Sequence, residues 1–201
     1  MTRPTVLLPL LAALAAACGD RTPAPAPPVA ATCDGGGMAR TCEVSGLFAG
    51  AAAPRLRLAT GDAVPDTLRL SLVRADGSVV PLPVFYGSTV WGMCGPTVDA
   101  RDLPRRDRLA AADVNGDGAD DLVVVAECMT GMGATGAHPF PAGAVYLGDG
   151  RGGWRSVAAV DSTLTDLAQA ACGGADGRPG GGGVAGDVRA LARDAVRRSL
   201  P

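Results

Sequence analysis

Oxygen-bearing side chains recur at alternate positions in one short segment, residues 113–121. Gly118, at the sixth position of this segment, permits a sharp reversal of the backbone. Calcium is held in proteins by about six to eight oxygen atoms, so the spacing predicts a calcium-binding loop. The candidate ligands are Asp113, Asn115, Asp117, the backbone carbonyl of Ala119, and Asp121.

The elements on either side of this loop are predicted to be strands. An EF-hand would need a bidentate glutamate at position 12, where this chain has Val124, and a helix after it. Residues 122–126 are instead an unbroken apolar run, which is typical of a buried strand. Ala111 and Ala112, just before the loop, belong to the incoming strand.

A calcium loop that leads directly into an apolar strand resembles the FG-GAP and VCBS repeats, with their pattern D-x-N-G-D-G-x-x-D-L-V-V. Residues 144–154 are similar to the second hairpin of that repeat, with Trp154 where phenylalanine is usual. The resemblance covers about residues 108–160 and implies the same five calcium ligands, with Asp120 in a non-ligand position. It also implies a structural ion that pins a turn between strands. The alternative is a solvated Asn-Gly-Asp-Gly turn that binds no ion.

The start of the chain is predicted to be an export signal over residues 1–17. Arg3 is followed by an apolar run over residues 6–17, which is too short to span a bilayer. The run ends in Leu-Ala-Ala-Ala before Cys18 and resembles the lipobox of bacterial lipoproteins, which implies a diacylated Cys18 and a membrane anchor. Gly19 directly after the cysteine favours the outer membrane. The alternative is an ordinary signal peptide cleaved after Ala17.

Composition divides the rest of the chain into a tether, a domain and a tail. Residues 18–32 contain alternating proline and alanine, which favour an extended tether. Residues 33–178 are expected to form a β-rich domain. Residues 179–201 combine a glycine-rich linker with a C-terminal helix.

The cysteines that follow an export signal would lie in an oxidising compartment, where disulfides persist. Cys33 and Cys42 flank a triple-glycine turn and are predicted to close a small loop. Cys94 with Cys128 is the second predicted pair, with Cys172 left over, although the sequence alone does not determine the connectivity.

The predicted fold is mainly β: a small antiparallel sheet domain with one propeller-blade-like unit and one or two C-terminal helices. Strands are expected over residues 67–74 and 79–86, and helices over residues 163–171 and 184–200. Thr163 and Asp166 suggest a capping box for the first helix. A closed propeller is excluded because it needs about four blades or more, at roughly 50 residues each.

Composition and motifs favour a binding protein over an enzyme. The formal net charge is −2, which gives no reason to expect nucleic acid as a partner. A Walker loop, a nucleophile elbow and a zinc-protease motif are all missing from the sequence. The expected role is adhesion, assembly or contact with an envelope or surface protein or a glycan. The alternative is a small envelope hydrolase, or an accessory domain, with a site in a loop over residues 130–143 that contains His138.

Overall fold

The computed structural model describes residues 29–36, 39–50, 52–60, 68–90, 93–94, 108–130, 138–172 and 187–201. The predicted export signal, the lipidation site Cys18 and residues 22–28 of the tether lie outside the described residues. The predicted glycine-rich linker up to residue 186 also lies outside them.

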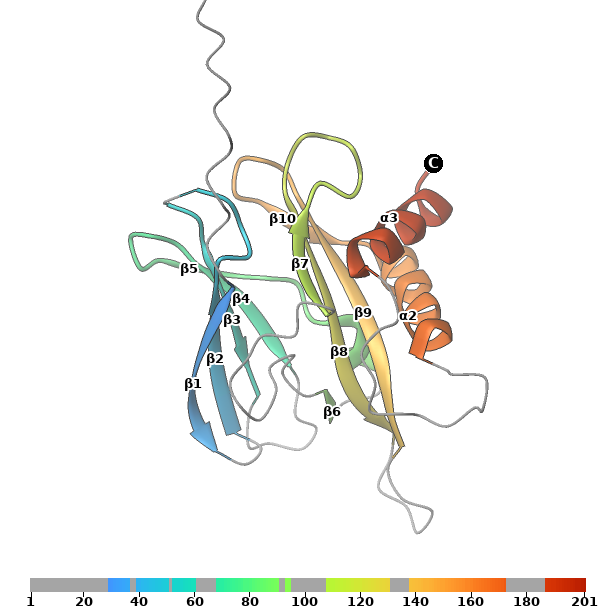
Figure 1. Cartoon of the computed structure of the whole chain (residues 1–201), viewed down its shortest axis with the longest axis horizontal. Helices are drawn as coiled ribbons and strands as arrows, with labels where there is room; N and C mark the ends of the chain where they lie inside the picture. The colour runs from blue at the N-terminus through green and yellow to red at the C-terminus, as the bar shows by residue number, and fades with distance from the viewer. Residues whose placement is uncertain are drawn as a thin grey trace, which may run out of the picture.

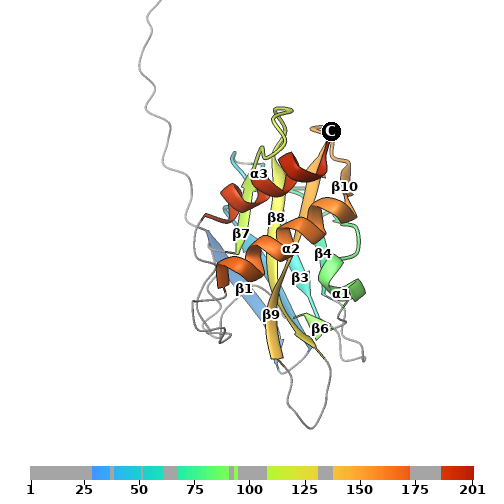
Figure 2. The same ribbon diagram turned by 90° about the vertical axis from the view of Figure 1, so that its right-hand side faces the viewer.

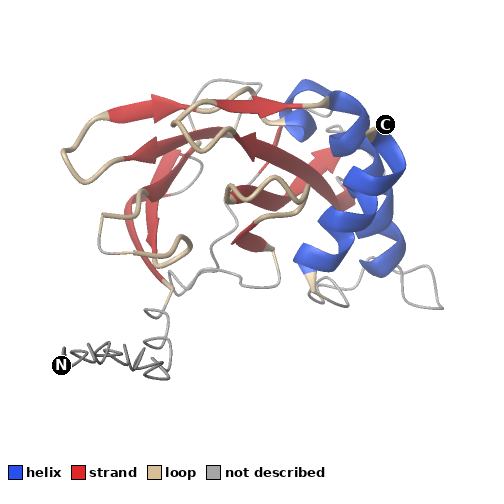
Figure 3. Ribbon diagram, turned by 90° about the horizontal axis from the view of Figure 1, so that it is seen from above, coloured by secondary structure: helices blue, strands red, loops and turns tan. Residues whose placement is uncertain are grey.

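The described chain is built in three layers (Figures 1 and 3). Two antiparallel sheets pack face to face, and a pair of helices covers the outer face of the second sheet. This arrangement confirms the prediction of a mainly β fold with helices toward the C-terminus.

The first sheet is a simple meander in which each strand pairs with the next along the chain. Leu56 and Leu58 point into the layer between the sheets, while Arg55 and Arg57 alternate with them on the outer face. The pairing of the first two strands continues back from Cys33–Cys42 to Ala30–Ser45, so the folded domain begins before Cys33. The strands are β1 (Ala30–Gly36), β2 (Ala39–Ser45), β3 (Arg55–Ala59), β4 (Arg69–Val73) and β5 (Val79–Pro81).

The strand predicted over residues 79–86 is shorter than expected, because β5 ends at Pro81. Leu82 still donates its N–H to the carbonyl of Leu70 (2.9 Å), but Pro83 has no N–H with which to continue the ladder. The chain then enters a short helix, α1 (Tyr86–Val90).

The second sheet is formed mainly by the segment for which a blade-like unit is predicted, about residues 108–160. Its last four strands pair in chain order, which is the arrangement of a four-stranded propeller blade, and β6 pairs with the far end of β8. The predicted strand over residues 122–126 is the first half of β8. The strands are β6 (Met93–Cys94), β7 (Leu109–Ala112), β8 (Asp121–Thr130), β9 (His138–Gly148) and β10 (Trp154–Ser156).

The loop predicted over residues 130–143 is wrong at both of its ends, where the structure has strand. Thr130 ends β8, and residues 138–143 form the first half of β9, paired with β8 from Thr130–His138 to Val125–Gly143. Two prolines are tolerated there because, among the described strands, only β10 pairs with the edge of β9 that faces away from β8, and it pairs with residues 146–148. Residues 131–137 lie outside the described residues.

The continuous apolar run in β8 arises because both faces of this strand are covered. Leu122 and Val124 face the first sheet, whereas Val123 and Val125 face the helices. A strand buried on both sides loses the alternation that marks a strand with one solvated face.

The helical layer consists of α2 (Ala158–Cys172) and α3 (Val188–Ser199), which lie side by side across the second sheet (Figure 2). The predicted capping box is wrong: α2 begins at Ala158, and the Thr163 hydroxyl lies inside the helix and donates to the carbonyl of Ala159 (2.9 Å). At α3, Asp187 is the N-cap, and its Oδ1 accepts the N–H of Arg189 (3.0 Å).

A buried carboxylate joins α2 to the second sheet. Asp161 is fully buried; its Oδ1 accepts the N–H of Val145 (2.8 Å), and its Oδ2 accepts the hydroxyl of Ser156. Burial raises the pKa of the Asp161 carboxyl to about 6, against the opposing effect of these two hydrogen bonds. One turn further on, the Thr165 hydroxyl accepts the N–H of Gly143 (2.9 Å), so α2 is held to β9 by polar contacts at two levels.

Both predicted disulfides are confirmed. Cys33 is bonded to Cys42 and Cys94 to Cys128, and each pair occupies directly opposed positions on adjacent antiparallel strands. The first bond joins β1 to β2 and the second joins β6 to β8. The side chain of Cys172 lies outside the description.

Candidate calcium site

The candidate loop connects β7 to β8 at one end of the second sheet (Figure 1). Ala112 pairs with Asp121, so the strand ladder closes the base of the loop. Gly116 and Gly118 have φ values of 81° and 86°, a left-handed conformation that side chains other than glycine rarely adopt. Local backbone geometry therefore explains why glycine stands at these two positions.

The first three polar side chains of the loop point to its own backbone. Asp113 accepts two N–H groups: Gly116 donates to Oδ1 (2.7 Å) and Gly118 to Oδ2 (2.9 Å). Asn115 Oδ1 accepts the N–H of Asp117 (3.0 Å). These are local side-chain-to-backbone bonds of the kind that aspartate and asparagine form in turns.

Asp117 continues this network. Its Oδ1 accepts the N–H of Ala119 (2.8 Å), and its Oδ2 accepts the side-chain amide of Asn115 (2.8 Å). The N–H of Ala119 and the amide of Asn115 lower the pKa of the Asp117 carboxyl, and the nearby charge of Arg155 lowers it further. Asp117 is exposed, so its carboxylate is ionised at neutral pH at the outer end of the loop.

Asp121 has a different environment at the base of the loop. Its side chain is fully buried; Oδ2 accepts the N–H of Val114 (2.8 Å) and Oδ1 accepts the N–H of Gly148 (3.0 Å). Burial raises the pKa of the Asp121 carboxyl, and repulsion from the charge of Asp117 adds to the rise. Asp121 therefore fastens the start of the loop to the end of β9.

A second acidic turn lies beside the loop, between β9 and β10. Asp149 Oδ1 accepts the N–H groups of Arg151 (2.7 Å) and Gly153 (2.8 Å), which lower the pKa of its carboxyl. The two turns are in contact: a Cβ added at Gly148 would lie 2.5 Å from the carbonyl oxygen of Asp120. Only a glycine at position 148 lets the two turns approach this closely.

The structure thus brings the predicted ligands onto one loop but gives them different surroundings. Asp113, Asn115 and Asp117 share one hydrogen-bond network, Ala119 contributes its N–H to that network, and Asp121 lies beneath it. Within the described part of the chain, no three Cys, His, Asp or Glu side chains converge in an arrangement that could hold a metal ion. The contact from Asp121 to Gly148 was missed at the level of sequence, because no local pattern links residues 27 positions apart.

Comparison with known proteins found no family model, curated protein or solved structure that matches the chain. Among the described residues, none of the helices has the length and apolar character needed to cross a bilayer.

Proposed function

We propose that this chain is a lipid-anchored protein of the bacterial cell envelope, facing the periplasm or the cell surface. Its β domain is stabilised by calcium at residues 113–121 and serves as a binding, adhesion or assembly module. Its partners are the membrane, through acylated Cys18, and an envelope or surface protein or glycan. The lipobox-like run before Cys18 and the proline-rich tether support the anchor. The two disulfides support an oxidising compartment.

The observation that carries the calcium proposal is the hydrogen-bond network that closes the loop. An oxygen that accepts one hydrogen bond keeps a second lone pair, so Asp113, Asn115 and Asp117 retain acceptor capacity in a loop that is already folded. The atoms that would coordinate the ion are all oxygens, which are the ligands that calcium prefers. The ligands would be these three side chains with the Ala119 carbonyl and Asp121.

Charge supplies the second argument. Four aspartates fall within residues 113–121. Burial raises the pKa of the Asp121 carboxyl, and repulsion from the charge of Asp117 adds to the rise. A divalent cation would neutralise this charge where the β7–β8 connection meets the β9–β10 turn. The bound ion would therefore stabilise the folded domain.

Calcium is expected to raise the midpoint of thermal unfolding. A calcium concentration about 100-fold above the dissociation constant adds about 2.7 kcal/mol to the free energy of unfolding, or about 5–10 °C for a domain of this size. The measurement is a thermal melt followed by circular dichroism, in calcium and then in EDTA.

Two variants test whether the calcium-dependent shift in the melting midpoint arises from the loop at residues 113–121. Asp117→Asn keeps the acceptor for the Ala119 N–H but removes the charge, so it should lose most of the calcium-dependent shift. Asp120→Asn removes a charge from a non-ligand position and should keep the shift. No calcium-dependent shift in the unmodified protein, or an equal shift in Asp117→Asn, would contradict the calcium proposal.

The lipid anchor has a separate test. Cys18→Ser is expected to abolish incorporation of labelled fatty acid and to move the protein from the membrane fraction to the soluble fraction, because the thiol is the acylated group. Cys172→Ser, which removes the other cysteine outside the two disulfides, serves as the control and should remain in the membrane fraction. Membrane retention of Cys18→Ser would show that the anchor lies elsewhere.

A further inference from the structure

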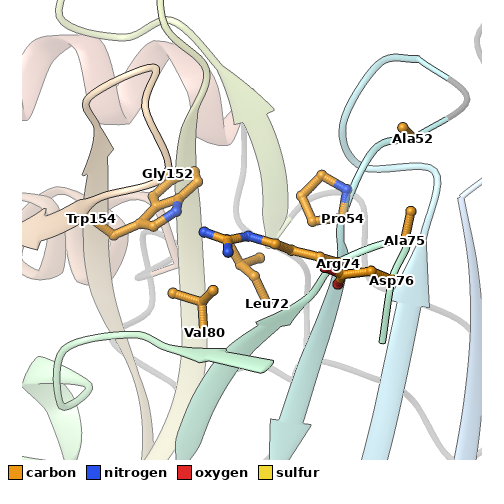
Figure 4. A pocket seen from close by; sticks show the side chains of 9 residues that line it. All are labelled: Ala52, Pro54, Leu72, Arg74, Ala75, Asp76, Val80, Gly152 and Trp154. Carbon is orange, nitrogen blue, oxygen red and sulfur yellow. The ribbon is translucent and has the colours of Figure 1, made fainter. Parts of the chain in front are cut away.

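A cavity of about 430 Å³ opens at the edge of the layer between the two sheets (Figure 4). One wall comes from the first sheet and its turns, and the opposite wall comes from the β9–β10 hairpin. Volumes of this order are typical of small-molecule sites. The lining residues from the first sheet and its turns are Ala52, Pro54, Leu72, Arg74, Ala75, Asp76 and Val80, and those from the hairpin are Gly152 and Trp154.

The interior of this cavity is mainly apolar. Leu72 is buried, and Val80 and Trp154 are half-buried against the core between the sheets. The indole of Trp154 is held by an edge-to-face contact with Phe48, with ring centroids 6.0 Å apart and an interplanar angle of 72°. The cavity therefore offers a positioned aromatic surface beside aliphatic side chains.

Among the described residues that line the cavity, one cation reaches across the opening. The exposed side chain of Arg74 extends from the end of β4 toward Gly152 and Trp154 (Figure 4). Its Nη2 lies 2.8 Å from the place where a Cβ at Gly152 would stand, so the glycine makes room for the guanidinium. Gly152 also has a φ of 95°, which favours glycine there independently.

The nearby carboxylates are engaged by their own turns. Asp76 Oδ1 accepts the N–H of Ser78 (2.9 Å), and hydrogen bonds from the hydroxyl and N–H of Ser78 lower the pKa of its carboxyl. Asp149 is held by the N–H groups of the β9–β10 turn. Among the described residues, no carboxylate forms an ion pair with the Arg74 guanidinium. The charge of Arg74 contributes to the lowered pKa of the Asp76 carboxyl from a longer distance.

We propose that this cavity binds a small organic anion with a flat apolar body, its carboxylate on Arg74 and its ring against Trp154. An aromatic or short-chain carboxylate matches both the apolar lining and the single positive charge, because guanidinium pairs with carboxylate through two parallel hydrogen bonds. The inference goes beyond the proposed binding module by naming a ligand class, and it does not depend on calcium.

The test compares two probes that share one body, 4-phenylbutyrate and the neutral 4-phenylbutanol. The full-length chain carries Trp91→Phe, so that the remaining tryptophan, Trp154, reports binding by its fluorescence, and isothermal calorimetry gives the affinities. We expect saturable binding of the anion, about threefold to tenfold tighter than the alcohol, because the ion pair is partly solvated. Titrations in EDTA separate this result from any failure of the calcium proposal.

Matched variants assign the selectivity to one side chain. Arg74→Gln is expected to bind the two probes equally, since the apolar cavity remains but the charge is gone. Arg69→Gln, which removes an exposed arginine at the start of β4, should keep the preference for the anion. Asp76→Asn keeps an acceptor for Ser78 and removes a negative charge from the lining, so it should bind the anion more tightly.

Four results would overturn the proposal. They are the absence of saturable binding by either probe, equal affinities in the unmodified protein, an anion preference that survives in Arg74→Gln, and tighter binding of a neutral disaccharide such as maltose. The last result would assign the cavity to glycans.

Discussion

Asp121→Ala is expected to lower the free energy of unfolding by about 2–6 kcal/mol, because it leaves two buried N–H groups without an acceptor at about 1–3 kcal/mol each. The donors are Val114, at the start of the loop, and Gly148, at the end of β9. The measurement is chemical denaturation in EDTA, so that the loss of a calcium ligand does not contribute.

Asparagine should not rescue this site. Both partners of Asp121 are backbone N–H groups, so the NH₂ of an asparagine would face a donor where the second carboxylate oxygen had been. Asp120→Ala is the matched control: its side chain is exposed, so it should change the free energy of unfolding by less than about 0.5 kcal/mol. A loss below 1 kcal/mol in Asp121→Ala, measured in EDTA, would show that Asp121 does not fasten the loop to β9.

Asp161→Asn is expected to change the pH dependence of stability. The ordinary pKa of this carboxyl is 3.8, and burial raises it to about 6 in the folded protein. The folded state therefore binds more protons between these values, so the contribution of Asp161 is fully present below about pH 4 and is lost as the pH rises through about 6. The change amounts to about 2–3 kcal/mol, at 1.36 kcal/mol per pKa unit.

The measured quantity is the difference in free energy of unfolding between Asp161→Asn and the unmodified protein, at pH 4 and at pH 7. This difference should shift by about 2–3 kcal/mol in favour of the asparagine variant. Taking the difference cancels the opposite trend from carboxyls whose pKa is lowered, such as Glu43 and Asp194. A difference that stays constant between pH 4 and pH 7 for Asp161→Asn would refute the assigned pKa.

The asparagine at position 161 should be tolerated, in contrast to one at position 121. Its carbonyl oxygen can accept the N–H of Val145, and its NH₂ can donate to the hydroxyl of Ser156, which is able to act as donor or acceptor. The two buried aspartates thus differ in the nature of their second partner. At position 121 the second partner is a backbone N–H, which only an acceptor oxygen can satisfy, so a carboxylate is needed. At position 161 the second partner is a hydroxyl, which can pair with either a carboxylate oxygen or an amide NH₂.

The candidate calcium loop and the Arg74 cavity share one structural element, the β9–β10 hairpin. Asp121 and Asp120 contact the hairpin at Gly148, and the other end of its turn supplies Gly152 and Trp154 to the cavity. Mutations in the loop should therefore be checked for an effect on the Trp154 fluorescence before they are interpreted as calcium effects alone.

The sequence by itself determined the local features of this protein. Asp113, Asn115 and Asp117 bond to backbone groups within five residues, so their arrangement depends on the loop alone. The Cys33–Cys42 bond, across a hairpin with a glycine turn, and the Asp187 cap of α3 are local in the same sense. Such features can be predicted from the sequence because residues close together in the chain are in contact in almost any fold that the chain could adopt.

Only the tertiary structure decided the features that depend on distant partners. The extent of β9 through two prolines follows from its pairing with β8, and the early start of α2 accompanies the contacts of Asp161 with Val145 and Ser156. The fastening of Asp121 to Gly148, and the meeting of Arg74 with Trp154, join segments that no local pattern relates. The physical reason for these long-range contacts is packing. Burial of the apolar faces of β8 and β9 determines where each neighbouring element ends, and this in turn determines which polar groups come into contact.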